Sequence, residues 1–287
     1  MNFYLQTSGK IPNIVLKIGS KPYPNDKDRQ NQTISYLLIC LFFVFLVMAQ
    51  LVYSGIPATI RSFRYDEVVS FCEVRKTWGG LSNMSSEYPL LYNGVIYPTA
   101  EHLYLAGRFS SHPEIVAEIL AHRNAMYCKR LFHGRAWAPM IRPDWAGLQL
   151  SWMRYVLNLK YEQHPSFRRL LQQTAGKVIL EDSTMLVGTN PLCGHSSFFW
   201  GAKDLTRREA IGNERRRITR EARLEGWSQA RLKLAREEIR ERIGQRVRGE
   251  FVGANVLGLL LTELRDSGHL ECSIPEDLLR LNGVTAA

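Results

Sequence analysis

One carboxylate stands out by its place at the start of a predicted helix. Glu101 follows Pro98 and Thr99, and Thr99 is the expected N-cap of a helix that runs to about Phe109. The helix dipole and the free backbone N–H groups keep a first-turn carboxylate ionised. Such an anion can stabilise the oxocarbenium ion that forms as a glycosidic bond breaks, or orient the attacking water. Acidic residues are also common in the first turn of helices where they have no catalytic role, so this position alone does not identify a catalytic residue.

Motifs for several other chemistries are missing from the sequence. It contains no GxGxxG, GxxxxGK[ST], HExxH or GxSxG pattern. Its five cysteines include no CxxC pair and are too few for a disulfide scaffold, so we expect reduced thiols. Cys193 and His195 are two candidate metal ligands, but a zinc site needs further partners that the sequence does not offer nearby. We therefore expect neither a cofactor nor a metal ion.

The composition is that of a globular protein. The chain has 287 residues, of which 45% are hydrophobic and 22% charged, and its formal net charge is +10. These values exclude collagen, a coiled coil over the whole length and wholesale disorder. The length suits one large domain or two small ones.

Short strands and many helices are expected to position Glu101. Asn93-Gly94 lies between two apolar triplets, which is the strongest short signal for a hairpin with a type I′ turn. The pattern also predicts strands at 68–74 and 178–180. It predicts further helices that begin at Pro113, Trp145, Pro165 and Asn255. The predicted fold class is α+β, mainly helical with a few short strands.

The first sixty residues differ from the rest. No charged residue lies between Gln30 and Ile60, and the apolar run Ile34 to Val52 is about as long as a bilayer core is thick. We predict a loosely ordered segment at 1–33, then a transmembrane helix at 34–54, and hence a single-pass membrane protein. A buried core helix, or a leader whose absence leaves a cytoplasmic protein, is the alternative.

The orientation of that predicted helix is not set by its flanks, because both carry basic residues. The N-glycosylation sequon at 83–85 lies in a loop that we expect near the active site, where a glycan would block access. We therefore expect the catalytic domain to be cytosolic.

A basic stretch from Lys203 to Arg248 carries most of the surplus charge. It holds fifteen Lys or Arg residues, eight Asp or Glu residues and few apolar ones, which predicts one or two exposed helices. The functional interpretation is an arm that binds nucleic acid or membrane phosphates. The alternative is a solvated helical excursion held by salt bridges, and the mixed charges favour it.

Several ordered motifs resemble one known family, the NADAR superfamily of YbiA-like proteins, over about residues 71 to 267. Gly80-Leu81-Ser82-Asn83 is similar to its loop, and Tyr97-Pro98-Thr99-Ala100-Glu101-His102 to its central motif. The remaining matches are Arg108-Phe109, Lys129, Gly134-Arg135, Asp144-Trp145, Met153, Lys160-Tyr161, Trp200-Gly201 and Gly253-Ala254-Asn255-Val256-Leu257-Gly258. The resemblance implies a NADAR-like catalytic domain at 65–270, interrupted by a basic helical insertion at 203–250 and followed by a C-terminal tail at 271–287.

The resemblance implies hydrolysis of the N-glycosidic bond between a ribose phosphate and an amine or base. Glu101 would be the catalytic carboxylate, and Trp145 and Trp200 would line the pocket, where a flat base can stack on an indole. Asn83 and Asn255 can form hydrogen bonds with the base edge or the ribose. The candidates for binding the phosphate are Arg108, Lys129 and Arg135.

Three functions therefore remain open. The first is an N-glycosidase that acts on phosphoribosylated aminopyrimidines of the riboflavin type. The second is a hydrolase that removes ADP-ribose from a base or nucleic acid, with 203–248 as the contact to the polymer. The third is a membrane-tethered module, held through 34–54, that binds a ribosyl ligand without turnover. Ser197 supports the third, because it stands where the family usually has Asp, although Asp182 could replace that Asp spatially.

Overall fold

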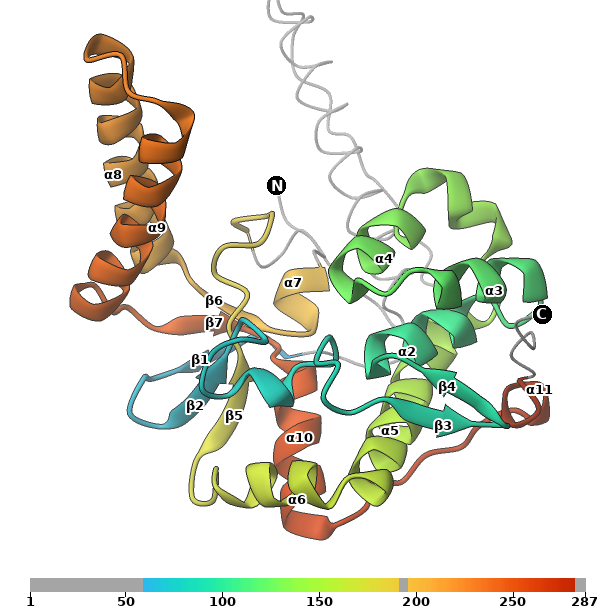
Figure 1. The fold of residues 1–287 in the computed structure, drawn as a ribbon. Helices are drawn as coiled ribbons and strands as arrows, with labels where there is room; N and C mark the ends of the chain where they lie inside the picture. Colours follow the sequence, from blue (N-terminus) through green and yellow to red (C-terminus); the bar gives the residue numbers. More distant parts are fainter. Residues whose placement is uncertain (1–58, 191–195, 282–287) are drawn as a thin grey trace, which may run out of the picture. The chain divides into compact units, whose positions relative to one another are not determined.

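Short strands and longer helices alternate through the part of the chain that the structure describes. The computed structural model describes residues 59–190 and 196–281 (Figure 1). The α+β fold class, mainly helical with a few short strands, is confirmed. The strands are β1 Arg61–Phe63, β2 Val68–Phe71, β3 Leu90–Tyr92, β4 Val95–Tyr97, β5 Val178–Glu181, β6 Ala202–Asp204 and β7 Phe251–Gly253.

The strands pair in three separate small sheets. β1, β7 and β6 form one antiparallel sheet, β2 pairs in parallel with β5, and β3 pairs with β4. The third pairing confirms the predicted hairpin, because Asn93 and Gly94 have φ of 51° and 82°, as a type I′ turn requires. The other two sheets join segments that are far apart in the sequence, which no local pattern predicts.

Helices supply most of the regular structure. They confirm the predicted helix starts at Pro113, Trp145 and Pro165, and the last core helix starts one residue after Asn255. The helices are α2 Ala100–Arg108, α3 Pro113–Ala121, α4 Ala125–Phe132, α5 Trp145–Gln163, α6 Pro165–Gln172, α7 Ser196–Phe199, α8 Leu205–Leu224, α9 Gln229–Arg246, α10 Val256–Ser267 and α11 Glu276–Leu279, with short 3-10 helices η1 Gly79–Leu81 and η2 Arg135–Met140.

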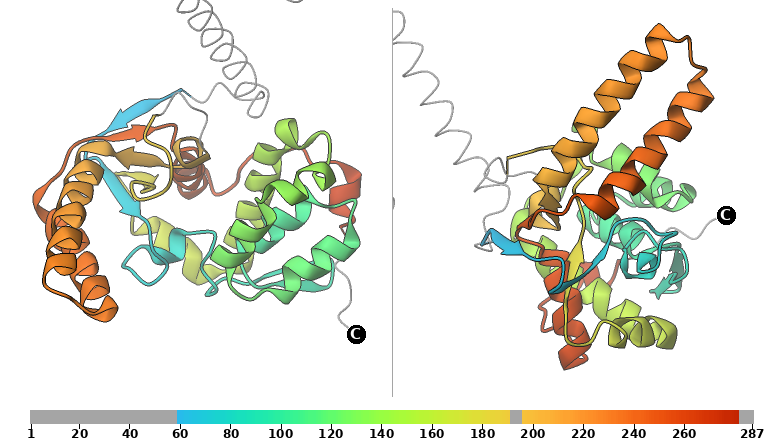
Figure 2. Two further views of the ribbon diagram at one scale, coloured as in Figure 1. Left: turned by 90° about the horizontal axis from the view of Figure 1, so that it is seen from above. Right: turned by 90° about the vertical axis from the view of Figure 1, so that its left-hand side faces the viewer.

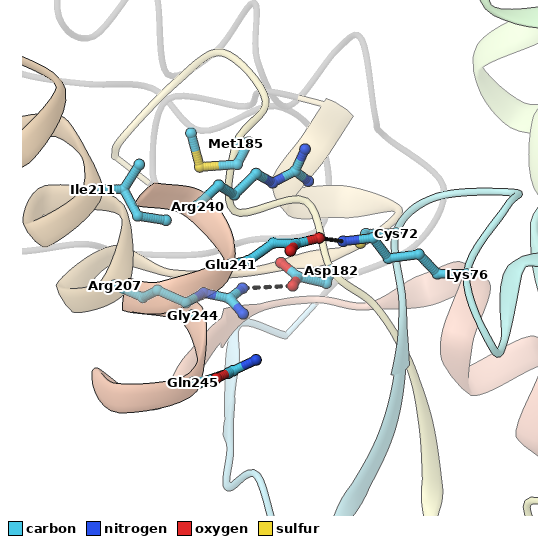
Figure 3. A pocket seen from close by; sticks show the side chains of 10 residues that line it. All are labelled: Cys72, Lys76, Asp182, Met185, Arg207, Ile211, Arg240, Glu241, Gly244 and Gln245. Carbon is cyan, nitrogen blue, oxygen red and sulfur yellow. Dashed lines mark hydrogen bonds and ion pairs between the residues drawn. The ribbon is translucent and has the colours of Figure 1, made fainter. Parts of the chain in front are cut away.

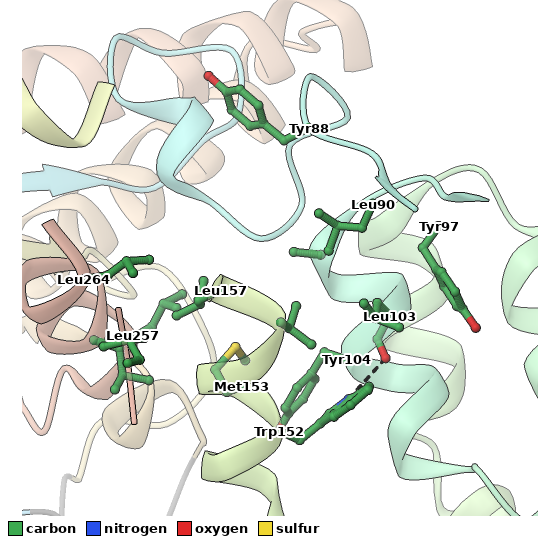
Figure 4. Packing of buried hydrophobic residues seen from close by; sticks show 14 of the residues in the cluster. Tyr88, Leu90, Tyr97, Leu103, Tyr104, Trp152, Met153, Leu157, Leu257 and Leu264 are labelled. Carbon is green, nitrogen blue, oxygen red and sulfur yellow. Dashed lines mark hydrogen bonds between the residues drawn. The ribbon is translucent and has the colours of Figure 1, made fainter. Parts of the chain in front are cut away.

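The main apolar core lies where α2 crosses α5. Trp152 on α5 is fully buried, and its indole N–H donates to the carbonyl of Leu103 on α2 at 3.2 Å (Figure 4). The two helices approach closely because Gly107 has no side chain. A Cβ built there would lie 2.1 Å from the indole nitrogen of Trp152. This contact fixes α2, and with it the position of Glu101.

The helices α8 and α9 form a long antiparallel hairpin between two paired strands. β6 leads into α8 and α9 leads back into β7, and the hairpin extends away from that sheet in all views (Figures 1 and 2). Asp204 joins its two ends, because one carboxylate oxygen accepts from Arg207 N at 2.8 Å and the other from Gly249 N at 2.9 Å. The helical segment therefore begins at Leu205, and Lys203 and Asp204 are buried strand residues.

The prediction of a transmembrane helix and of a membrane localisation is corrected. The predicted segment 34–54 lies outside the described residues. Among the helices of residues 59–190 and 196–281, none is both long and apolar enough to cross a bilayer. α5, α8 and α9 have the necessary length, but charged residues recur along each of them. The structure thus supports the α+β fold class but not the predicted transmembrane helix.

Candidate functional site

Glu101 lies buried at the first turn of α2, as the N-cap prediction required. The Thr99 hydroxyl accepts from His102 N at 3.4 Å, and Glu101 N donates to the carbonyl of Asn83 at 2.9 Å. Only 3% of Glu101 is exposed. A buried carboxylate is stable here because the free N–H groups of the first turn and the helix dipole favour its negative charge.

The neighbouring His102 serves this helix start as a neutral hydrogen-bonding group. Its Nε2 lies 2.6 Å from the carbonyl of His122, and its Nδ1 lies 2.8 Å from the Thr99 hydroxyl. A carbonyl can only accept, so Nε2 carries the proton and Nδ1 accepts from Thr99. Burial lowers the pKa of His102, which is consistent with the neutral ring. His102 therefore holds the capping residue in place.

A lysine from another helix lies directly against the carboxylate. Lys129 Nζ on α4 is 3.3 Å from Glu101 Oε1, and about a third of the Lys129 side chain is exposed against 4% for Glu101. The sequence predicted Lys129 as a phosphate ligand, whereas the structure places it at the carboxylate. The partial exposure leaves the ammonium accessible to a ligand that approaches Glu101.

Three aromatic rings lie together beside this helix face. Tyr104 contacts Trp145 with ring centroids 5.2 Å apart, and it contacts Trp200 edge-on at 5.8 Å. Tyr104 was missed in the sequence. Its signal was available, because it follows Glu101 by three positions and so lies on the same face of α2. The predicted pair of tryptophans is thus brought together through a tyrosine.

Asn83 lies buried in the loop that precedes the β3–β4 hairpin, and one of its polar atoms has no hydrogen-bond partner among the described residues. Its Nδ2 contacts Met153 Sδ at 3.2 Å, while its Oδ1 makes no hydrogen bond to the described residues. A buried acceptor without a partner is costly unless a ligand or water satisfies it. The loop itself is held by Lys160, whose buried ammonium donates to the carbonyls of Gly80 and Ser82 at 3.0 and 3.1 Å.

Asn255 occupies a different kind of position from Asn83. Its Nδ2 donates to the carbonyl of Ile179 at 2.8 Å, and its Oδ1 accepts from Glu181 N at 3.0 Å. It is fully buried with a φ of 52°, in the left-handed region that asparagine tolerates. Both ends of the amide are therefore engaged by β5, and Asn255 positions that strand against α10.

The end of β5 presents a carboxylate that the sequence had not suggested. Successive residues of a strand face opposite sides. Glu181 shares the side of Ile179, in the core cluster that contains Trp145 and against which Trp200 packs. Burial raises the pKa of Glu181; Lys129 lowers it, and Glu101 raises it further. Glu181 is thus a second carboxyl group in the field of Glu101, and its environment favours the protonated form.

The residue predicted to replace the family's Asp faces the other way. Asp182 is bound by Arg207 of α8 with 2.5 Å between Oδ2 and Nη2 (Figure 3). Ser197, at the position where the family usually has Asp, donates its hydroxyl to the carbonyl of Val187 at 3.0 Å. Asp182 is therefore part of the junction with the hairpin, and Glu181 is the acid that lies on the side of Glu101.

The other two predicted cations have different surroundings. The pKa of His133 is lowered by desolvation and by the charges of Arg108 and Lys129, so these three groups lie near one another. Arg135 is exposed at the first residue of η2 and forms no side-chain hydrogen bond or ion pair with the described residues. Arg108 is thus close to the site, whereas Arg135 is available at the surface.

Within residues 59–190 and 196–281, no three His, Cys, Asp or Glu side chains come together in a way that could hold a metal ion. Cys193 and His195 lie outside those residues.

Comparisons with known proteins find one family that this chain resembles. Residues 70–185 match the family model of the NADAR domain. The chain is 29% identical to N-glycosidase YbiA of Escherichia coli (strain K12) over 122 residues, which are 42% of this chain and 74% of the relative. N-glycosidase YbiA of Shigella boydii serotype 4 (strain Sb227) matches to the same extent. An NMR structure of the E. coli protein YbiA aligns with a TM-score of 0.40 and 23% identity, over 63% of this chain and 87% of that chain.

The chain is thus similar to the NADAR, or YbiA-like, proteins over residues 70–185, which make up less than half of its length. Its curated relatives are named N-glycosidases, so the family-level activity is hydrolysis of an N-glycosidic bond.

Proposed function

We propose that this protein hydrolyses the N-glycosidic bond between a ribose phosphate and an aminopyrimidine, with Glu101 as the catalytic carboxylate. The observation that carries the proposal is the buried position of Glu101 in the first turn of α2, on the helix face that carries Tyr104, whose ring contacts Trp145 and Trp200. A flat base stacks on such rings, which brings its glycosidic carbon toward the carboxylate.

Charge development along the reaction suits two carboxyl groups in different protonation states. As the bond from C1′ to nitrogen breaks, the electron pair goes to the nitrogen and positive charge develops on the ribose, where anionic Glu101 stabilises it. Glu181, whose raised pKa favours the protonated form, donates its proton to the leaving nitrogen. Water adds to C1′ and gives its proton to Glu101. The products are the ribose phosphate and the free amine, and one water is consumed.

Polar groups around the carboxylate suit the rest of such a substrate. Asn83 Oδ1 can accept a hydrogen bond from an amino group of the pyrimidine, since it has no partner among the described residues. Lys129 and Arg108 supply positive charge near Glu101, and Arg135 adds an exposed guanidinium for the phosphate. Asn255 acts indirectly, by holding β5 and therefore Glu181.

The proposal is tested by the release of ribose 5-phosphate from the phosphoribosyl aminouracil substrate. Glu101→Gln keeps the shape of the side chain and removes its charge, so we expect a loss of about 10³-fold in kcat/KM. The matched control is Glu114→Gln, because Glu114 is also a first-turn acid but is exposed on α3. Equal rates for the wild type and Glu101→Gln, with both folded, would exclude this role.

A second candidate substrate is ADP-ribose attached to a base, and the arginines of the α8–α9 hairpin favour it because a polymer carries many phosphates. The same assay on ADP-ribosylated guanine separates the two. Ligand-induced thermal stabilisation without turnover of either substrate identifies a binding module. In that case Ser197→Asp, which restores the usual acid of the family, is expected to raise the rate.

A further inference from the structure

The α8–α9 hairpin is anchored to the rest of the protein by ion pairs near its base. Arg207 binds Asp182, and Arg240 Nη1 lies 2.7 Å from Glu73 Oε1. Lys76 lies 3.9 Å from Glu241, and together with the Arg207–Asp182 pair it lines a polar pocket at the junction (Figure 3). Arg207, Arg240 and Glu241 are therefore engaged in ion pairs that fix the attachment of the hairpin.

The distal half of the hairpin has the opposite character. Between α8 and α9 lies an open groove of about 870 Å³ that no carboxylate lines. Five arginines line it, and none of them forms an ion pair within the described part of the chain. These arginines are Arg215, Arg216, Arg220, Arg223 and Arg236. On the same helices, Arg217 and Arg242 share Glu214 at 3.0 and 2.9 Å. Five arginines without an ion pair among the described residues are thus gathered in one groove.

Arg215 shows how strongly the groove lacks an anion. Its Nε is buried and has no hydrogen-bond partner among the described residues. Burial and the charges of Arg240 and Arg236 lower the pKa of its guanidinium. Like charges held together at a half-buried site are stabilised when an anion binds between them.

An aromatic side chain, Trp227, lines the groove from the connection between α8 and α9. The guanidinium of Arg231 stacks on Trp227 at 3.8 Å from the ring centroid, and the indole N–H donates to Glu225 at 2.9 Å. These contacts hold the ring in one orientation. Trp227 and Leu232 also line the groove, so it offers an aromatic surface beside its arginines.

We infer that this groove binds single-stranded nucleic acid, with the phosphates on the groove arginines and an unpaired base on Trp227. Clustered arginines with an aromatic ring are the combination that single strands favour, since phosphates supply charge and every base has a face that stacks. A membrane surface or an acidic peptide would use the charges but would not need a ring fixed beside them. The inference goes beyond the proposed hydrolysis and does not depend on it.

The test measures binding of the full chain to a labelled single strand of about 12 nucleotides, RNA or DNA, by fluorescence anisotropy at several salt concentrations. Arg220→Gln with Arg223→Gln is expected to weaken binding about tenfold. It should also make the slope of log affinity against log salt shallower by about 1.4, because two phosphate contacts are lost. Arg217→Gln with Arg242→Gln removes the same charge from the paired face and should weaken binding less than about threefold.

Trp227→Ala, with Trp227→Phe as its conservative partner, tests the stacking. We expect about a tenfold loss with alanine and little loss with phenylalanine. Equal losses in the two arginine pairs, or tighter binding to anionic vesicles or to poly-glutamate than to the single strand, would overturn the inference. Glu101→Gln is expected to bind normally, so failure of the hydrolysis assay and failure of this assay can be told apart.

Discussion

The part of the protein outside the α8–α9 hairpin, called the core below, and the hairpin itself use charged residues in opposite ways. In the core, buried lysines donate hydrogen bonds to backbone carbonyls. Lys160 donates to the carbonyls of Gly80 and Ser82, and Lys203 donates to three consecutive carbonyls from Leu186 to Gly188. In the hairpin, the buried side chains are a short apolar seam formed by Ile211, Ile218, Ala222 and Ile239, and most charges lie outside it.

Substitutions of charged residues should therefore have different consequences in the two regions. A charge that satisfies a buried carbonyl cannot be removed without leaving that carbonyl unpaired, which costs free energy of unfolding. A charge on the outside of the hairpin can be removed with little effect on the fold, so its effect appears in binding. The predictions below test this contrast, beginning with the largest effect.

After Glu101→Gln, the largest effect on the rate is expected at Glu181. Glu181→Gln should lower kcat by about 10²-fold or more, because a general acid contributes about that factor. The wild-type rate should fall as the pH rises through the raised pKa of Glu181, since only the protonated form donates. A pH–rate profile of both proteins checks this. Asp182→Asn, the neighbour on the other face, is the control, and an equal loss there would contradict the assignment.

An effect of comparable size, on stability instead of rate, is expected from the buried ammonium of Lys160. Burial lowers the pKa of Lys160 to about 7, so the folded state binds fewer protons than the unfolded state above that pH. The free energy of unfolding therefore rises with pH relative to Lys160→Met, by about 3 kcal/mol from about pH 7 to about pH 10. Urea titrations at each pH measure this difference. If the difference in free energy of unfolding between the wild type and Lys160→Met stays constant over this pH range, Lys160 does not titrate there.

The next effect concerns the close approach of α2 and α5. Gly107→Ala places a methyl group against the buried indole of Trp152, so it should lower the free energy of unfolding by about 1–3 kcal/mol. It should also lower activity, because α2 carries Glu101. Gly147→Ala on α5 is the control, since a Cβ there meets no atom within 4 Å. Equal stabilities of the two variants would contradict the described packing.

The smallest effect is expected in the hairpin. Gly212→Ala on α8 adds a methyl group whose nearest neighbour is the flexible end of Arg216, at 3.5 Å. Alanine is the better helix former, so the free energy of unfolding should rise by up to about 1 kcal/mol. Thermal unfolding measures it. A destabilisation like that of Gly107→Ala would mean that the two regions do not differ in tolerance.

Local signals predicted much of the fold and part of the site. The Asn93-Gly94 turn and the Thr99 cap depend on neighbouring residues only, so they could be predicted from the sequence. The pairing of β1 with β7 joins Arg61 to Gly253, and no local pattern encodes it. The transmembrane prediction was based on composition alone. Its segment 34–54 lies outside the described residues, and no described helix is long and apolar enough to cross a bilayer.

Residue type and order alone predicted that Glu101 lies in the first turn of a helix and that positive charge is concentrated in 203–248, because helix caps and net charge are local properties of the sequence. Only the tertiary structure decided that Lys129 pairs with Glu101, that Glu181 rather than Asp182 lies on its side, and which hairpin arginines remain unpaired. Each of these depends on which elements pack together, and that packing is set by the burial of side chains distant in the sequence.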